Sequence, residues 1–136
     1  MKALTISGLC AGLALAAACT QPSEPQGALL YAELCVGCHG LSGTGDGPLT
    51  ADLPVPVADL TTISARNGGT FPMAEVMSTI DGFTRAQHGN LVMPDFGALL
   101  EESPTVLYDS GDGISTPTPS ALIALAEYLE TLQTTP

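Results

Sequence analysis

Three stretches of this sequence repeat apolar residues every three to four positions, which is the period of an amphipathic helix. They cover residues 27–35, 72–80 and 119–132. We expect one face of each helix to be buried, with Glu127 and Glu130 of the third helix directed outward. The apolar positions are Leu30, Tyr31 and Leu34, then Met73, Val76, Met77 and Ile80, and finally Leu122, Leu125, Ala126 and Leu129.

Residues that start and stop helices flank two of these stretches. Pro72 suits a first helical turn, where its missing N–H costs little, and Gly82 after Asp81 suits the left-handed position that ends a helix. Thr118 is the expected N-cap of the third helix, with Pro119 in its first turn.

Between these helices the chain is rich in Gly, Pro, Thr and Asp, which predicts loops rather than strands. The longest such stretch, residues 101–119, is expected to be an acidic loop, either packed on the domain or contacting a partner. The sequence therefore predicts three helices joined by long loops.

The N-terminus has the outline of a secretory signal over residues 1–18, with Lys2, a short apolar run and small residues at its end. The run is too short for a membrane span of about 20 residues. Residues 15–19 resemble the lipobox of bacterial lipoproteins, with Cys19 as the lipid-bearing residue. Ordinary cleavage after Ala16 or Ala18 is the alternative. We expect a lipid-anchored tether over 19–26, one domain over 27–136, and a place in the periplasm or cell envelope.

The motif Cys35-Val-Gly-Cys38-His39 has the spacing of covalent c-type haem attachment. Each thiol can form a thioether to a haem vinyl group, and His39 then binds the iron. A thioredoxin-like redox pair would need a strand–helix–strand context, and a zinc site would need a fourth ligand. With Cys10 lost in the leader and Cys19 acylated, no cysteine remains for a disulfide. One such motif predicts one haem c.

Three residues are candidates for the second axial ligand of the iron. Met93 precedes a proline in a loop and offers a soft thioether. His88 is the rival, and His/His ligation would lower the reduction potential relative to His/Met. Met77 lies on the apolar face of a predicted helix, so we expect it in the core.

Several of these segments resemble class I cytochromes c. The Gly27–Tyr31 pair resembles their first helix, residues 120–129 resemble their terminal helix, and Met93-Pro-Asp-Phe-Gly97 resembles their distal-ligand loop. With the haem motif, the resemblance covers nearly all of the chain after residue 26. It implies an all-α fold wrapped around one covalent haem, with His39 and Met93 as axial ligands.

The resemblance also implies one role near the haem, and the scarcity of cations in this acidic chain suggests a second. The carbonyl of Pro48 should accept the Nδ1–H of His39 and so orient the ring. Arg66, one of two arginines in the chain, either pairs with a haem propionate or is an ordinary solvated side chain.

The formal net charge of −11 restricts which classes of partner this protein can bind. Loss of Lys2 with the leader would leave no lysine, so docking through a ring of lysines, as in mitochondrial cytochromes c, is not expected. An acidic surface repels nucleic acid and steers toward basic partners. We expect a one-electron carrier that meets redox proteins with a basic or apolar docking face, and no catalytic residue. A haem subunit of a larger oxidoreductase, or a haem sensor or enzyme with an exchangeable distal ligand, are the alternatives.

Overall fold

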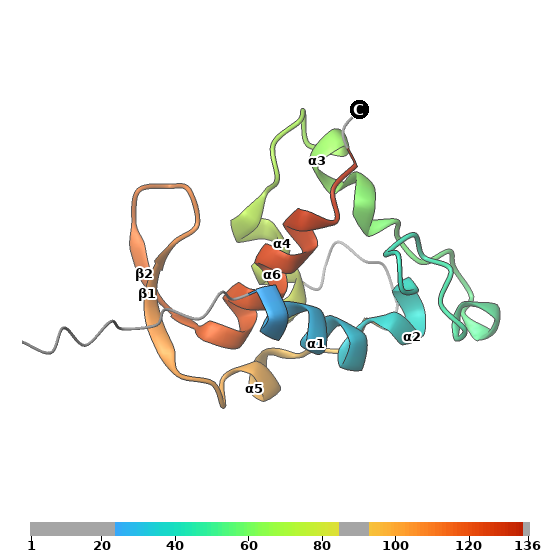
Figure 1. Cartoon of the computed structure of the whole chain (residues 1–136), viewed down its shortest axis with the longest axis horizontal. Coiled ribbons are helices and arrows are strands. Elements are labelled where there is room, and N and C mark those ends of the chain that lie inside the picture. The colour runs from blue at the N-terminus through green and yellow to red at the C-terminus, as the bar shows by residue number, and fades with distance from the viewer. Residues whose placement is uncertain (1–23, 85–92, 135–136) are drawn as a thin grey trace, which may run out of the picture.

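The computed structural model describes residues 24–84 and 93–134, and within them the chain is mostly helical (Figure 1). The helices are α1 (Glu24–Leu34), α2 (Val36–His39), α3 (Ile63–Arg66), α4 (Met73–Asp81), α5 (Gly97–Leu100) and α6 (Ser120–Thr131). The 3-10 turns η1 (Thr50–Asp52) and η2 (Leu60–Thr62) and the strands β1 (Thr105–Asp109) and β2 (Ser115–Pro119) complete these elements.

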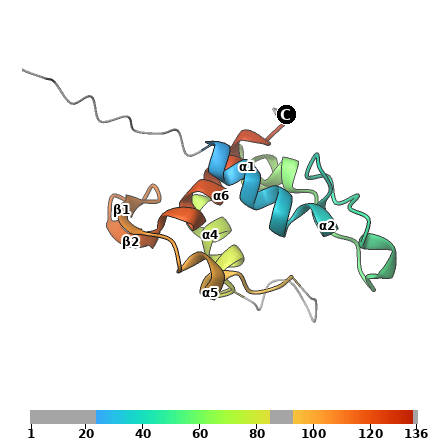
Figure 2. The ribbon, with the colours of Figure 1, turned by 60° about the horizontal axis from the view of Figure 1, so that its bottom comes forward.

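Helices α1 and α6, from the two ends of the domain, pack directly against each other (Figures 1 and 2). Gly27 makes this possible, because a Cβ there would overlap the carbonyl oxygen of Ala124 and lie 2.7 Å from the Cβ of Tyr128. One turn later, the rings of Tyr31 and Tyr128 lie with centroids 5.3 Å apart. The absence of a side chain at Gly27 therefore lets the first and last helices approach closely.

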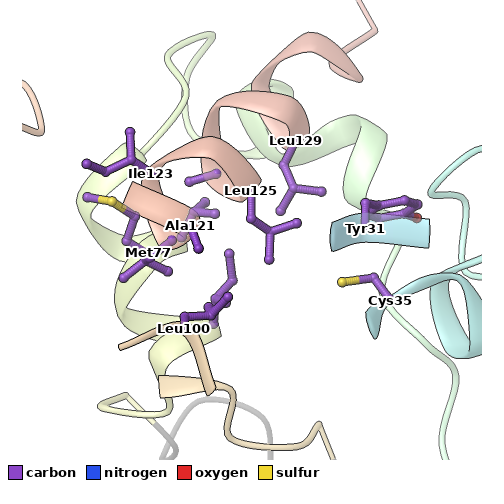
Figure 3. Packing of buried hydrophobic residues seen from close by; sticks show 12 residues of the cluster. Tyr31, Cys35, Met77, Leu100, Ala121, Ile123, Leu125 and Leu129 are labelled. Atoms are coloured by element: carbon purple, nitrogen blue, oxygen red, sulfur yellow. The ribbon is translucent and has the colours of Figure 1, made fainter. Parts of the chain in front are cut away.

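The hydrophobic core lies where α1, α4, α5 and α6 meet (Figure 3). The predicted apolar faces are buried or packed against this core, and Met77 is a core residue as expected. Helix α6 is buried more completely than one apolar face predicts, since every residue from Ala121 to Ala126 is buried. Neighbours on several sides, including the β-hairpin, account for this burial.

The prediction of a loop over residues 101–119 is wrong for most of its length. β1 and β2 form an antiparallel two-stranded sheet, with Thr105 opposite Pro119 and Asp109 opposite Ser115. Thr105, Val106 and Tyr108 of β1 are residue types with high strand propensity, but the prolines and glycines around them favoured a loop.

The start of α6 also differs from the expectation. Thr118 lies in β2, and Pro119 occupies the N-cap position without a side-chain cap. The first free N–H groups of the helix are satisfied from a distance, since Ser120 donates to the carbonyl of Pro104 (2.9 Å) and Ala121 donates to Ser103 Oγ (3.0 Å). Ser103 and Pro104 lie just before β1, far from α6 in the sequence, so a rule that examines only the residues next to a helix cannot find this cap.

The remaining helix bounds lie close to those predicted. α1 begins at Glu24, so residues 24–26 of the predicted tether are helical. α4 begins after Pro72 and ends at Gly82, whose φ of 94° is the left-handed conformation expected there. No helix in the described part of the chain is both long and apolar enough to cross a membrane. The predicted signal and Cys19 lie outside the described residues.

Candidate functional site

A cavity of about 420 Å³ opens beside α2 and is lined by four parts of the chain together with Leu129 of α6. The end of α1 with α2 forms one wall, residues 53–67 a second, α4 a third, and the segment from Met93 to Phe96 the fourth. Its volume is within the range of cofactor pockets. The walls are mainly apolar, with Leu53, Val57, Leu60, Ile63, Val76 and Ile80 among the lining residues.

The two cysteines and the histidine of the motif line this cavity together. The amide of Cys35 bonds to the carbonyl of Tyr31 at 2.9 Å, and the amide of His39 bonds to the carbonyl of Cys35 at 2.8 Å. These bonds carry helical geometry through the junction of α1 and α2. Because residues three and four apart share a helix face, Cys38 and His39 lie on the same side as Cys35.

The thiol of Cys35 lies at the edge of the hydrophobic core, beside Tyr31 (Figure 3). Burial, and then the neighbouring Cys38, raise the pKa of the Cys35 thiol to about 11. Neither sulfur is in a disulfide. In the unmodified chain this thiol therefore stays protonated, and a protonated thiol reacts more slowly with oxidants than a thiolate does.

The imidazole of His39 is oriented by the main chain of a distant segment. Its Nδ1 lies 3.1 Å from the carbonyl oxygen of Ala58, which acts as the acceptor. In a ring that donates through Nδ1, Nε2 is the nitrogen that can bind a metal.

The acceptor predicted from the resemblance, the carbonyl of Pro48, is therefore wrong. The reason is the path of the chain after α2. Gly47 donates to the carbonyl of Cys38 (3.1 Å) and Leu49 to that of Gly37 (2.9 Å), so this segment runs along the backbone of α2. Gly47 is needed there, since a Cβ would lie 2.5 Å from the Gly37 oxygen. The next segment, ending at Ala58, reaches the ring instead.

Met93 lies on the fourth wall of the cavity, with Pro94 and Phe96. It is partly buried and packs against the hydrophobic core. Met77 is buried and is not among the residues that line the cavity. His88 lies outside the described residues. Among the described ligand candidates, Met93 is thus the residue that the fold brings to the same cavity as His39.

Comparison with known proteins adds to this geometry. The family model described as Cytochrome c matches residues 25–133, which is most of the chain. The chain belongs to the cytochrome c family. No curated protein and no solved structure matches it.

Membership of the family means that this cytochrome carries a covalently bound c-type haem. The residues of the cavity fit that group. Two free thiols and a metal-binding nitrogen line one wall, a thioether lies on another, and apolar side chains line the space between them. Within residues 24–84 and 93–134, no group of three or more His, Cys, Asp or Glu residues is arranged so that it could hold a metal ion by itself.

The polar side chains that line the cavity include Arg66, Asn67, Glu75 and Thr79. Arg66 is exposed, and its guanidinium donates to the carbonyl of Asp59 at 2.9 Å and to the hydroxyl of Thr62. Hydrogen bonds from the hydroxyl and amide of Thr61, with a smaller contribution from the charge of Arg66, lower the pKa of Asp59. These contacts hold Arg66 at the cavity, where its predicted pairing with a propionate stays a prediction.

Two features of this site were missed by sequence reasoning. The acceptor at Ala58 is a backbone carbonyl, and no side chain marks its position. Gln133, just after α6, uses both ends of its amide to hold the segment that carries Leu60 and Ser64. A polar residue at the end of a helix gives no signal of a partner that lies about 70 residues away.

Proposed function

We propose that this cytochrome is a one-electron carrier with His39 and Met93 as the axial ligands of its haem. The observation that supports this most is that His39 and Met93 line one cavity together with Cys35 and Cys38. Bound there, the haem supplies the reversible change between Fe(II) and Fe(III). The family supports electron transfer in general, and the ligand pair is the specific part of the proposal.

The chain's own residues would keep the ligands in place in both oxidation states. The carbonyl of Ala58 fixes the His39 ring, and Pro94 restricts the backbone directly after Met93. Apolar walls exclude water from the cavity. Because protein ligands would take both axial positions, none is left for a substrate. Electron transfer also needs no side chain that acts as an acid, a base or a nucleophile.

We further propose that the mature protein works in the bacterial periplasm or cell envelope, held to a membrane through lipid on Cys19. The support is the signal-like pattern of residues 1–18 and the small residues before Cys19. Mass spectrometry of the mature protein would report the cleavage site, the acyl groups and the attached haem together. Cleavage after Ala16 or Ala18 with an unmodified Cys19 would contradict the anchor.

Two substitutions of similar volume test the axial ligand. Met93→Leu should abolish the weak long-wavelength band that a methionine–Fe(III) bond gives, should lower the reduction potential, and should let the reduced protein bind carbon monoxide. Met77→Leu is the matched control: the same change in the core should leave all three measurements unaltered. A Met93→Leu variant that keeps the band would overturn the assignment of Met93.

A further inference from the structure

The β-hairpin has two outer edges, and the hydrogen-bond pattern shows which residues each edge presents. The amide of Ser120 donates to the carbonyl of Pro104 at 2.9 Å, which makes positions 104 and 120 a hydrogen-bonded pair. Hydrogen-bonded and non-bonded pairs alternate in an antiparallel ladder. Thr105, Leu107 and Asp109 are therefore in non-bonded pairs, and their N–H and C=O groups point away from β2.

The same alternation places Pro117 and Pro119 at the outer edge of β2. Proline has no N–H, so this edge cannot offer the donors that a further strand needs. At β1 the outward positions keep their N–H groups. Within residues 24–84 and 93–134, the sheet contains no strand beyond these two. The hairpin is thus closed to pairing on one side and open on the other.

The surface around the open edge is apolar and acidic. Leu107 is 72% exposed, and Val106 and Ile114 are also exposed. Four carboxylates belong to the hairpin or precede it, and the region 93–134 contains no lysine or arginine. These carboxylates are Glu101, Glu102, Asp109 and Asp112.

The turn of the hairpin is fixed by one of these carboxylates. Asp109 Oδ1 accepts hydrogen bonds from the amides of Gly111 (2.9 Å) and Gly113 (3.0 Å). The same two bonds lower the pKa of Asp109, so it remains charged at neutral pH. The turn is therefore fixed, and β1 carries a negative charge at its end.

We propose that the outer edge of β1 is a docking site for an extended, basic segment of a partner protein, which joins the hairpin as a third strand. Backbone bonds to Thr105, Leu107 and Asp109 would supply the pairing, Leu107 an apolar contact, and the carboxylates the attraction for basic side chains. The edge is only five residues, or roughly 17 Å, long. Such a small site gives a weak, reversible complex, which suits an exchanging partner.

The position of the hairpin leaves the haem cavity free. The hairpin and α2, which lines the cavity, lie at opposite ends of the domain in both views (Figures 1 and 2). A partner docked at β1 would hold the cytochrome without covering the cavity. The proposal does not depend on the axial ligands. A second copy of this chain is a poorer occupant, because it would bring two acidic edges together.

A synthetic peptide tests the site on the haem-loaded mature protein. The probe is a short capped peptide in which lysine and valine alternate, and the control peptide replaces each lysine by glutamate. With the isotope-labelled, reduced protein, NMR should show shifts and slower hydrogen exchange at the amides of Thr105, Leu107 and Asp109. The affinity for the lysine peptide should fall as salt rises, and the glutamate peptide should not bind.

Matched variants separate pairing from simple contact. Leu107→Pro removes one outward N–H and should weaken binding roughly tenfold, whereas Leu107→Thr keeps this N–H and should weaken it less. A cross-strand signal between Val106 and Thr118 reports whether the hairpin survives. If it does not, Glu101→Gln with Glu102→Gln, outside the strands, should still weaken binding and flatten its salt dependence.

Three results would overturn the proposal. The first is equal binding of the lysine and glutamate peptides. The second is a set of shifted amides that lies away from β1, or unchanged affinity in a Leu107→Pro variant whose hairpin is intact. The third is self-association of the cytochrome through the same amides without any peptide, which would make a second copy the occupant.

Discussion

The hydroxyl of Tyr31 connects the packing of the helices to the haem-binding turn. It donates a hydrogen bond of 2.7 Å to the carbonyl of Gly40, the residue directly after His39. Burial is the main cause that raises the pKa of Tyr31 to about 12, so the hydroxyl stays protonated and keeps donating at neutral pH. One side chain thus fills the interface with α6 and also fixes the end of α2.

Removing the hydroxyl of Tyr31 should lower the stability of the protein, whereas removing the hydroxyl of the neighbouring Tyr128 should not. Tyr31→Phe leaves the buried Gly40 carbonyl without this donor, so we expect the free energy of unfolding of the haem-loaded protein to fall by about 1–3 kcal/mol. Denaturant unfolding measures it. Tyr128→Phe is the control, because its ring lies beside Tyr31 but its hydroxyl has no hydrogen-bond partner among the described residues. Equal losses in the two variants would refute the role of the bond.

At the scale of elements, the contact between α1 and α6 determines how the two ends of the domain meet. It depends on the absence of a side chain at Gly27, where the carbonyl of Ala124 approaches the helix. Glycine within a helix otherwise lowers stability by about 1 kcal/mol relative to alanine. Close packing therefore outweighs helix propensity at this position.

The sign of the Gly27→Ala effect tests this balance. If helix propensity were the larger effect at this position, the substitution would stabilise the protein. We expect a loss of about 1–3 kcal/mol in thermal or denaturant unfolding, because the added methyl group forces the helices apart. Gly37→Ala in α2 is the comparison, since its Cβ would meet only the flexible end of Leu49 at 3.1 Å. A stabilised Gly27→Ala variant would contradict the packing argument.

The end of α6 is joined to the cavity wall by Gln133. Its amide nitrogen donates to the carbonyls of Leu60 and Leu129, both at 2.8 Å, and its oxygen accepts from the amide of Ser64 at 2.9 Å. The backbone of Thr134 adds a bond of 2.9 Å to Thr61. These bonds hold η2 and α3, which supply Leu60, Ile63 and Arg66 to the cavity.

Loss of the Gln133 amide should loosen this segment. Gln133→Leu leaves the amide of Ser64 and the carbonyl of Leu60 without these partners, so stability should drop by about 2 kcal/mol. Hydrogen exchange should accelerate at residues 60–64 before it does in α1. Gln26→Leu, the same change at an exposed position of α1, should stay within about 0.5 kcal/mol of the unmodified protein. Unchanged exchange at residues 60–64 would show that the bonds contribute little.

At the scale of the whole molecule, charge is the dominant property. The full sequence has fourteen Asp and Glu residues against three Lys and Arg residues, and Arg66 is the one of these three that lies within the described residues. The exposed apolar residues are spread over separate segments, including Leu41, Leu49 and Leu107. Long-range attraction should therefore come from the negative field, and short-range contact from these apolar side chains.

Small redox reagents of opposite charge can measure that field. The rate of electron exchange with a cationic ruthenium ammine complex should fall as salt is added, because the Debye length shrinks to about 8 Å at physiological ionic strength. The rate with anionic hexacyanoferrate should rise over the same range. Stopped-flow absorbance of the haem follows both. Equal salt profiles for the two reagents would show that the net charge does not steer encounters.

The sequence by itself determined the features that depend on neighbouring residues. The spacing of Cys35, Cys38 and His39 identified the haem motif, and the helical period identified α1, α4 and α6 within a few residues. Gly82 ended its helix as predicted. Each of these follows from the geometry of a single turn, in which residues three or four apart share a face.

The tertiary structure decided where separate segments meet. The acceptor for His39 is Ala58 rather than Pro48, the cap of α6 comes from Ser103 and Pro104, and residues 105–119 form a hairpin. Each of these contacts uses at least one backbone group as donor or acceptor, and nearly every residue carries such groups. Which of them pair depends on the path of the chain in space, and the order of side chains alone does not record that path.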